Sequence, residues 1–236
     1  MTPGAEVADA NACRIARASL ADVEARLPGP GTAWLTAGED LRLQGIVATL
    51  RRRQYLAGHW LLREMASRAH GGEPADWRFE TDTDPRPRLR HADGRILWGS
   101  LSHSGEHLAA AIASAPVGLD LERPRKPRDY VAIARFLFSP EEADQVAATD
   151  DGPARERVFH LFWALKEARG KRGGEGLQPS QARRVTARTA AAEAAEAWHW
   201  DLADGGCLAL AAWPGVAIEA SIAAGPAGAW RYAGAG

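Results

Sequence analysis

Cysteine and lysine are both scarce in this sequence. Its 236 residues include two cysteines, Cys13 and Cys207, which lie far apart and match no metal-binding or redox spacing. We therefore expect two reduced thiols and no structural disulfide. Lysine occurs only as Lys126, Lys166 and Lys171, and arginine supplies the other 26 of the 29 basic residues. Two lysines five residues apart in such a chain suggest a site that needs a compact ammonium group rather than a planar guanidinium.

Long apolar runs and an excess of one charge are also missing. No run reaches the roughly 18 apolar residues of a membrane span, and the amino terminus has no basic start followed by an apolar stretch. These absences predict a cytoplasmic protein that does not bind membranes. The formal net charge is −1, so the chain as a whole has no electrostatic reason to bind nucleic acid. Apolar residues make up 46% of the chain, which is enough for a real core.

Helices are predicted at four places. Capping-box patterns at Thr36 and Ser139, each followed three residues later by a glutamate, predict the starts of two helices. Apolar residues at helical spacing predict longer helices over about 50–69 and 153–171.

Strand patterns follow the helices in each half of the chain. A hairpin is predicted to join 107–114 to 117–122 near Ala115 and Pro116. The other predicted strands are 77–81, 96–101, 198–202, 207–213 and 216–222.

This order of elements predicts the fold class. Helices precede strands in both halves, although the first 30 residues show no clear period. We predict an α+β fold of two pseudo-symmetric halves, each with helices and an antiparallel sheet, in a single monomer. The boundary is placed at Pro116, which divides the chain into 1–116 and 117–236. A cleft between two such halves is a natural ligand site.

Acidic and apolar residues alternate in the segment VGLDLE at 117–122. On a strand, Asp120 and Glu122 project from one face while the apolar residues between them enter the core. Two neighbouring carboxylates repel each other. A Mg²⁺ ion would relieve that repulsion, because it prefers a few carboxylates and leaves positions for water and phosphate oxygens. The alternative is a half-exposed strand with a solvated acidic face.

A predicted helix carries the second chemical pattern, WALKEARGK at 163–171. Trp163, Glu167 and Lys171 are four residues apart and line one stripe, with Lys166 at its edge. We expect Trp163 to be buried and to support this helix. An exposed salt bridge beside a core tryptophan is the alternative.

The third pattern is LSHSG at 101–105, a turn after an apolar strand. Backbone amides and hydroxyl groups around Ser102 and His103 can cradle a phosphate. A serine–histidine nucleophile is a rival interpretation, but the chain has no G-x-S-x-G elbow, and adjacent residues of an extended chain point apart. A polar turn with a surface histidine is the third possibility.

Taken in order, LSHSG, VGLDLE and WALKEARGK resemble the 4′-phosphopantetheinyl transferase superfamily, in particular its larger monomeric type that activates peptide and polyketide synthases. Weaker similarity comes from YLAGHWLLR, DPRPRL and FLFSPEE, and the resemblance covers about residues 35–177. It implies an enzyme of secondary metabolite biosynthesis that uses coenzyme A and Mg²⁺. The implied reaction transfers the phosphopantetheine arm to a serine of an apo acyl or peptidyl carrier protein and releases 3′,5′-ADP.

The resemblance also implies roles for residues of the carboxyl-terminal half. Asp120, Glu122 and Glu167 would hold the Mg²⁺, and Lys166 and Lys171 would meet the phosphates. Glu167 and Lys166 are the catalytic candidates. Glu167 would take the serine proton, either directly or through a water molecule.

The amino-terminal half would hold the other end of coenzyme A. By the same resemblance, Ser102, His103 and Arg86 surround the 3′-phosphate and the adenine, so we expect discrimination against 3′-dephospho-coenzyme A. Arg53 is a further candidate contact, because the position that aligns with a family arginine is Gln54. A basic rim at 123–128 is a candidate dock for the carrier, since carrier domains are usually acidic.

Two other functions are compatible with parts of the sequence. Arginine clusters at 51–53, 86–90 and 123–128 suggest a non-catalytic module that binds an acidic protein or nucleic acid. Such binding would weaken with salt and need no Mg²⁺. The other is an unrelated Mg²⁺-dependent phosphotransferase acting on nucleotides, but the chain has neither a P-loop nor the kinase signatures.

Overall fold

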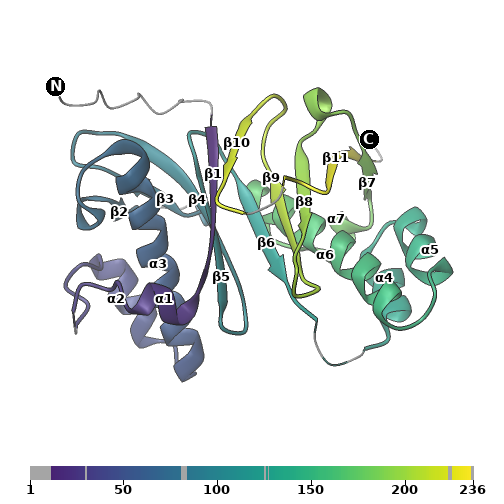
Figure 1. Cartoon of the computed structure of the whole chain (residues 1–236), viewed down its shortest axis with the longest axis horizontal. Helices are drawn as coiled ribbons and strands as arrows, with labels where there is room; N and C mark the ends of the chain where they lie inside the picture. Colours follow the sequence, from purple (N-terminus) through teal and green to yellow (C-terminus); the bar gives the residue numbers. More distant parts are fainter. Residues whose placement is uncertain are drawn as a thin grey trace.

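Four layers, in the order helix, sheet, sheet, helix, make up the computed structural model, which describes residues 12–29, 31–80, 84–124, 126, 128–222 and 225–234 (Figure 1). The fold is a mixed α+β structure of two halves, as predicted. None of the described helices is long and apolar enough to cross a membrane.

In both halves helices come before most of the strands, and the first strand of the chain is the exception. Up to residue 122 the elements are β1 Ala12–Ser19, α1 Leu20–Glu24, α2 Ala37–Gln44, α3 Thr49–His70, a 3-10 turn at Pro74–Asp76, β2 Arg78–Phe79, β3 Arg88–Arg90, β4 Ile96–Ser104, β5 His107–Ala113 and β6 Gly118–Glu122. Beyond it they are α4 Tyr130–Leu137, α5 Pro140–Ala148, α6 Pro153–Gly173, α7 Pro179–Ala182, β7 Val185–Thr189, a 3-10 turn at Ala192–Ala194, β8 Ala197–Asp201, β9 Cys207–Ala211, β10 Ala217–Ala220 and β11 Gly228–Gly234.

Two sheets form the centre of the molecule. The first has the strand order β10-β1-β5-β4-β3-β2, and the second has the order β6-β9-β8-β11-β7. Among the described residues, every strand pair is antiparallel except β1 with β10. Figure 1 shows these two strands side by side although they come from opposite ends of the chain.

Successive side chains of a strand point to opposite faces of its sheet, and this alternation produces the layers. On β5, Leu108, Ala110 and Ile112 pack under α3, whereas Ala109 and Ala111 face the second sheet. On β9 the alternation repeats, because its leucines face the first sheet and its cysteine and alanines face α6. Each sheet therefore has one face against a helix and one face against the other sheet.

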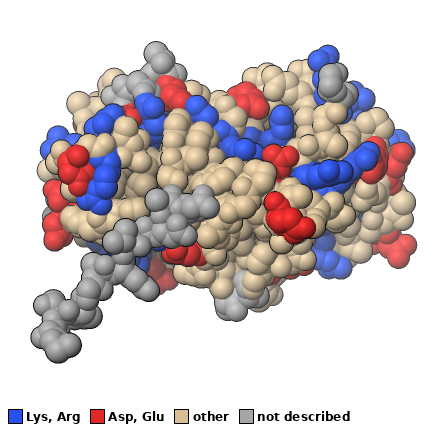
Figure 2. Space-filling model, turned by 90° about the horizontal axis from the view of Figure 1, so that it is seen from above, with Lys and Arg blue, Asp and Glu red and all other residues tan. Residues whose placement is uncertain are grey.

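Charged side chains of both signs lie on the face of the molecule seen in Figure 2. Basic and acidic ones are interspersed among uncharged side chains. This distribution agrees with the formal net charge of −1.

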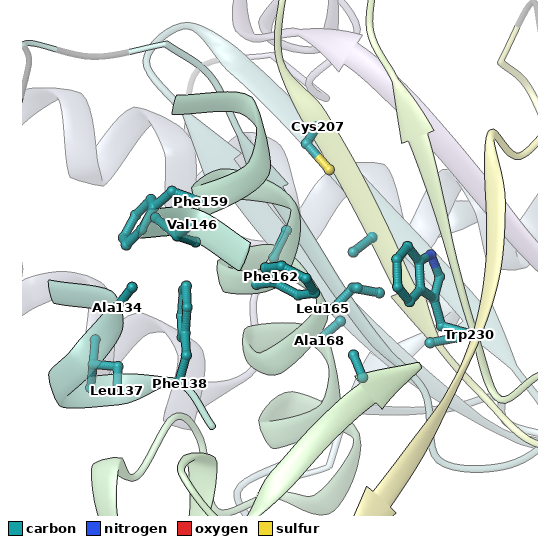
Figure 3. Packing of buried hydrophobic residues seen from close by; sticks show 14 of the residues in the cluster. Ala134, Leu137, Phe138, Val146, Phe159, Phe162, Leu165, Ala168, Cys207 and Trp230 are labelled. Carbon is teal, nitrogen blue, oxygen red and sulfur yellow. The ribbon is translucent and has the colours of Figure 1, made fainter. Parts of the chain in front are cut away.

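Aromatic rings fill the core beneath α6. Figure 3 shows Phe138, Phe159 and Phe162 among the helices, with Trp230 of β11 reaching in from the second sheet. Cys207 lies in the same cluster and Cys13 between the two sheets, and both are buried free thiols, as predicted. Burial raises the pKa of both thiols.

The predicted helices are confirmed. The spans 50–69 and 153–171 correspond to α3 and α6, and both capping boxes form. Thr36 accepts from the backbone of Glu39, and Ser139 accepts from that of Glu142.

The predicted hairpin between 107–114 and 117–122 is wrong. β5 forms its hairpin with β4, and β6 pairs with β9 in the second sheet. The reason is that β5 already has β1 on one edge and β4 on the other, so no edge remains for β6.

The division of the chain at Pro116 stays a prediction. The chain passes from the first sheet to the second between β5 and β6, but β10 returns to the first sheet beside β1. β1 itself comes from the first 30 residues, where the sequence showed no period.

The backbones of β6 and α6 approach each other very closely at Gly118. A Cβ atom on this residue would lie 1.8 Å from the carbonyl oxygen of Ala168 and 2.5 Å from the amide nitrogen of Arg172. Only glycine allows this approach without a shift of strand or helix.

Replacing Gly118 by alanine should therefore push α6 away from β6. Overpacking of this kind costs typically about 1–3 kcal/mol, and here the clash is with backbone. Gly234→Ala is the matched control, because a Cβ on this strand glycine meets nothing within 4 Å. Urea denaturation followed by circular dichroism measures both variants, and equal stabilities would contradict the prediction.

Candidate active site

A cleft of about 340 Å³ lies between α3 and β4 on one side and β6 and α6 on the other. All three sequence blocks contribute to it. The lining residues from those blocks are Leu101, Ser102, His103, Asp120, Glu122, Trp163, Glu167 and Lys171. The predicted stripe of α6 therefore faces the predicted acidic strand.

Asp120 is the centre of a buried polar cluster. Its Oδ1 lies 2.7 Å from Lys171 Nζ and accepts a hydrogen bond of 2.8 Å from the hydroxyl of Ser102. Lys171 also donates to Ser102 Oγ at 3.2 Å and to the carbonyl oxygen of Leu119 at 3.0 Å. The ammonium group has three N–H donors, and these three contacts use them all.

The second oxygen of Asp120 is different. The carboxylate is 5% exposed, and Oδ2 is buried without a hydrogen-bond partner among the described residues. A buried, unpaired carboxylate oxygen is costly, so it marks a place where a bound cation or donor would stabilise the protein.

Glu167 and Glu122 complete the acidic wall. Burial raises the pKa of Glu167, the negative charge of Asp120 raises it further, and Lys171 opposes both effects. Glu122 is buried at 8% exposure and lines the same cleft. Repulsion between carboxylates, which the sequence predicted for Asp120 and Glu122, thus also involves Glu167 on the facing helix.

A smaller aromatic hollow of about 120 Å³ adjoins the cleft. Glu122 and Trp163 line both spaces, and Tyr130 and Phe159 line the hollow. Trp163 is half-buried rather than buried, and it packs on the core with one side only. The expectation that Trp163 is buried is therefore wrong, because its side chain also lines the cleft and the aromatic hollow.

Lys166 does not reach the cleft, which corrects the role expected for it. Its Nζ donates to the carbonyl oxygens of Ala182 at 2.8 Å and Val185 at 2.5 Å and lies 2.8 Å from Glu142 Oε2. The side chain is 3% exposed. Burial lowers the pKa of Lys166, and the Glu142 carboxylate opposes that shift. Lys166 therefore ties α6 to α5 and to the turn between α7 and β7.

Both carboxylate oxygens of Glu142 accept hydrogen bonds from further donors. It accepts hydrogen bonds from the backbone nitrogen and hydroxyl of Ser139 and from the backbone nitrogen of Ala187. Its role extends beyond the helix cap that the sequence indicated.

Arg53 and Arg86 also lie outside the cleft lining. Arg53 forms two hydrogen bonds of 2.7 Å with the Glu24 carboxylate. Arg86 pairs with Asp84, stacks 4.4 Å from the ring centroid of Trp98, and lines a separate hollow at the end of α6. The structure thus brings Ser102 and His103 to the cleft but neither of these arginines.

The cleft has a wall that the sequence reasoning missed. Arg51, Gln54, Tyr55, Gly58 and His59 of α3 line it opposite the carboxylates. Their spacing is helical, so the signal was present, but the sequence did not show which face of α3 meets the cleft.

No preformed metal cage exists among the described residues. Nowhere in them do three or more histidine, cysteine, aspartate or glutamate side chains stand close enough to hold a metal ion by themselves. Mg²⁺ takes only part of its ligands from carboxylates and the rest from substrate and water, so a site that the substrate completes is compatible with this arrangement.

Comparison with known proteins identifies the family. A sequence model of the 4′-phosphopantetheinyl transferase superfamily matches residues 116–208. A 4′-phosphopantetheinyl transferase of Bacillus subtilis is 30% identical over 155 residues, which cover 61% of this chain and 67% of the relative. The chain belongs to the 4′-phosphopantetheinyl transferase superfamily.

Other relatives agree but match over less of their length. The 4′-phosphopantetheinyl transferase HetI of a Nostoc species is 30% identical over 61% of this chain and 62% of its own. The 4′-phosphopantetheinyl transferase Sfp of Bacillus subtilis is 32% identical over 52% of each chain. The chain thus spans about half to two thirds of these relatives.

The burial of Lys166 predicts a stability defect. Lys166→Met leaves the Glu142 carboxylate buried without its counter-charge, and breaking a buried pair in this way costs about 3–5 kcal/mol of unfolding free energy. Lys171→Met should cost less, because this side chain is 29% exposed and borders the cleft. Urea denaturation measures the free energy of unfolding of both variants. A Lys166→Met protein as stable as the wild type would contradict the structural role of Lys166.

Proposed function

We propose that this protein transfers the 4′-phosphopantetheine arm of coenzyme A to a serine of an apo carrier protein and releases 3′,5′-ADP. One observation carries the proposal: Ser102, Asp120, Glu167 and Lys171, from three separate sequence blocks, meet in one cleft. Membership of the superfamily supports the reaction class.

The acidic wall fits a Mg²⁺ ion. Asp120, Glu122 and Glu167 would hold it, and the unpaired Oδ2 of Asp120 and the raised pKa of Glu167 both indicate uncompensated negative charge there. Carboxylate oxygens are the ligands that Mg²⁺ prefers. When bound, the ion supplies positive charge against the diphosphate of coenzyme A.

Lys171 is the cation that this chain contributes to the phosphates. Its ammonium group is half-buried in the cleft wall and aligned by Ser102, Asp120 and the Leu119 carbonyl. A phosphate oxygen must replace one of these three acceptors to be bound, since no N–H remains.

Glu167 is the proposed base. The serine oxygen forms a bond to the β-phosphorus as the bond from that phosphorus to the bridging oxygen breaks, and the leaving 3′,5′-ADP keeps the electron pair. The serine proton goes to the Glu167 carboxylate. Glu167 lines the cleft, so its carboxylate is open to a substrate hydroxyl there.

The arginine-rich binding module is less well supported. Many arginines of its clusters already pair with carboxylates within the chain, among them Arg53 with Glu24, Arg90 with Glu80 and Arg123 with Asp204. Figure 2 shows basic and acidic side chains interspersed on the face in view. An extended basic surface for nucleic acid would need unpaired cations on one face.

The carrier and the cellular setting belong to the same proposal. An acidic acyl or peptidyl carrier protein of secondary metabolism is the proposed acceptor, and the enzyme would act as a cytoplasmic monomer. The basic segment 123–128 is the proposed dock. Arg128 of this segment lines the aromatic hollow next to the cleft.

The proposal is tested by incubating the protein with coenzyme A, Mg²⁺ and an apo carrier protein and looking for the mass of the added arm. Asp120→Asn, Glu122→Gln and Glu167→Gln should each abolish transfer while thermal melting shows a folded protein. Asp201→Asn is the matched control, because Asp201 is an exposed aspartate on β8 of the same sheet. Near wild-type transfer by Asp120→Asn would refute the metal assignment.

A further inference from the structure

The free edge of β6 is closed by side chains instead of by another strand. β6 lies at the end of the second sheet and, among the described strands, pairs only with β9. Leu119 in the middle of β6 is 0% exposed, so its backbone groups need partners within the protein. The hydroxyl oxygen of Ser100 accepts a hydrogen bond of 2.8 Å from the Leu119 N–H group. The ammonium group of Lys171 donates one of 3.0 Å to the Leu119 carbonyl oxygen.

The partner on β4 belongs to a stripe of serines. Trp98 packs on the cluster between the two sheets, and every second residue of β4 after it is a serine. Ser100 and Ser102 therefore also face the second sheet. Ser100 holds the backbone of Leu119, and Ser102 donates to the side chain of the next residue, Asp120, at 2.8 Å. β4 thus contacts β6 at two neighbouring points.

The two contacts differ in how a ligand affects them. Ser102 lines the cleft, and its hydroxyl also accepts a hydrogen bond from Lys171, the cation proposed for the phosphates. A phosphate oxygen bound at Lys171 would compete with Ser102 directly. Ser100 is 3% exposed and is not among the described residues that line the cleft. Its contact with β6 therefore persists when a substrate enters.

We propose that Ser100 is a positioning residue for the transfer reaction. The proposal rests on the proposed function. By accepting from the Leu119 N–H group, Ser100 fixes β6 beside β4, and Asp120 directly follows Leu119 on the strand. This contact sets how Asp120 and Lys171 face the wall of the cleft made by α3 and β4. Ser100 does not touch the substrate and acts through the β6 backbone.

Removing the hydroxyl group leaves a buried donor without a partner. In Ser100→Ala the Leu119 N–H group stays in the interior, where no hydrogen bond replaces the lost one. The strand then shifts, and a displacement of about 1 Å can lower a reaction rate about 100-fold. The groups that bind coenzyme A remain in place, so the loss should appear in kcat rather than in KM.

Steady-state transfer from coenzyme A to an apo carrier protein tests the proposal. Ser100→Ala should lower kcat about 10- to 100-fold and leave the KM for coenzyme A within about threefold. Ser100→Thr keeps a hydroxyl group and should recover kcat to within about threefold of the wild type. Ser221→Ala is the matched control and should leave kcat unchanged. The Ser221 hydroxyl also ties two distant segments, at 3.2 Å from the carbonyl oxygen of Ile15, but outside the cleft lining.

Hydrogen exchange of the Leu119 amide, followed by NMR, gives a readout without turnover. Ser100→Ala should speed the exchange of this amide at least about tenfold relative to the other amides of β6 and β9. Val146→Ala is the stability control, because Val146 is a fully buried residue of α5 in the core beneath α6. This variant should speed the exchange of all protected amides alike and leave kcat unchanged below its melting temperature.

The possible results separate positioning from general support and from the proposed function. The role of Ser100 would be overturned if Ser100→Ala kept kcat within about twofold of the wild type, or if Ser100→Thr were as slow as Ser100→Ala. A loss of kcat in Val146→Ala as large as that in Ser100→Ala would overturn it too, because lowered stability would then explain both. A wild-type protein that transfers no arm would overturn the proposed function instead.

Discussion

The contact between the backbones of β6 and α6 at Gly118 is the constraint on which the candidate site depends. The two backbone atoms that crowd Gly118 belong to Ala168 and Arg172. Each of these residues directly follows a cleft residue, Glu167 and Lys171, and Asp120 lies two residues after Gly118 on the strand. Because the backbones meet here, the side chains beside them come within hydrogen-bond distance, and Lys171 Nζ reaches Asp120 Oδ1 at 2.7 Å. Because Gly118 has no side chain, the side chains of the neighbouring cleft residues are brought together.

Local patterns in the sequence predicted the elements of the fold but not their neighbours. Capping boxes and helical periods depend on residues three or four apart, so α3 and α6 could be predicted directly. Strand pairing depends on which sheet edges are occupied. Nothing near Pro116 shows that β5 is flanked by β1 and β4, and nothing in the first 30 residues marks β1, which is paired on both sides by distant segments.

The same limit applies to the prediction of the candidate site. The alternation in VGLDLE and the stripe of α6 correctly grouped Asp120 with Glu122 and Glu167 with Lys171, because each pair shares one element. Lys166 was misplaced because α6 is buried on more than one side, and periodicity gives a side chain's direction without saying what lies there. Arg51 was missed for a related reason. Three consecutive arginines are equivalent in the sequence, and only the packing of α2, α1 and the β4–β5 turn assigns partners to two of them.

Two lysine–carboxylate pairs, whose lysines are five residues apart on α6, show how a supporting residue differs from a functional one. In the pair of Lys166 with Glu142, both carboxylate oxygens are satisfied by backbone or side-chain donors. Such a pair holds elements together, and removing one partner is strongly destabilising because the other charge is left buried. In the pair of Lys171 with Asp120, Oδ2 is left without a donor, and the nearby Glu167 has a raised pKa. Folding leaves this second pair incomplete at a cost in stability, and that cost is recovered only when a ligand supplies the missing positive charge. The incomplete pair is therefore the better marker of the functional site, although both pairs involve a lysine of the same sequence block.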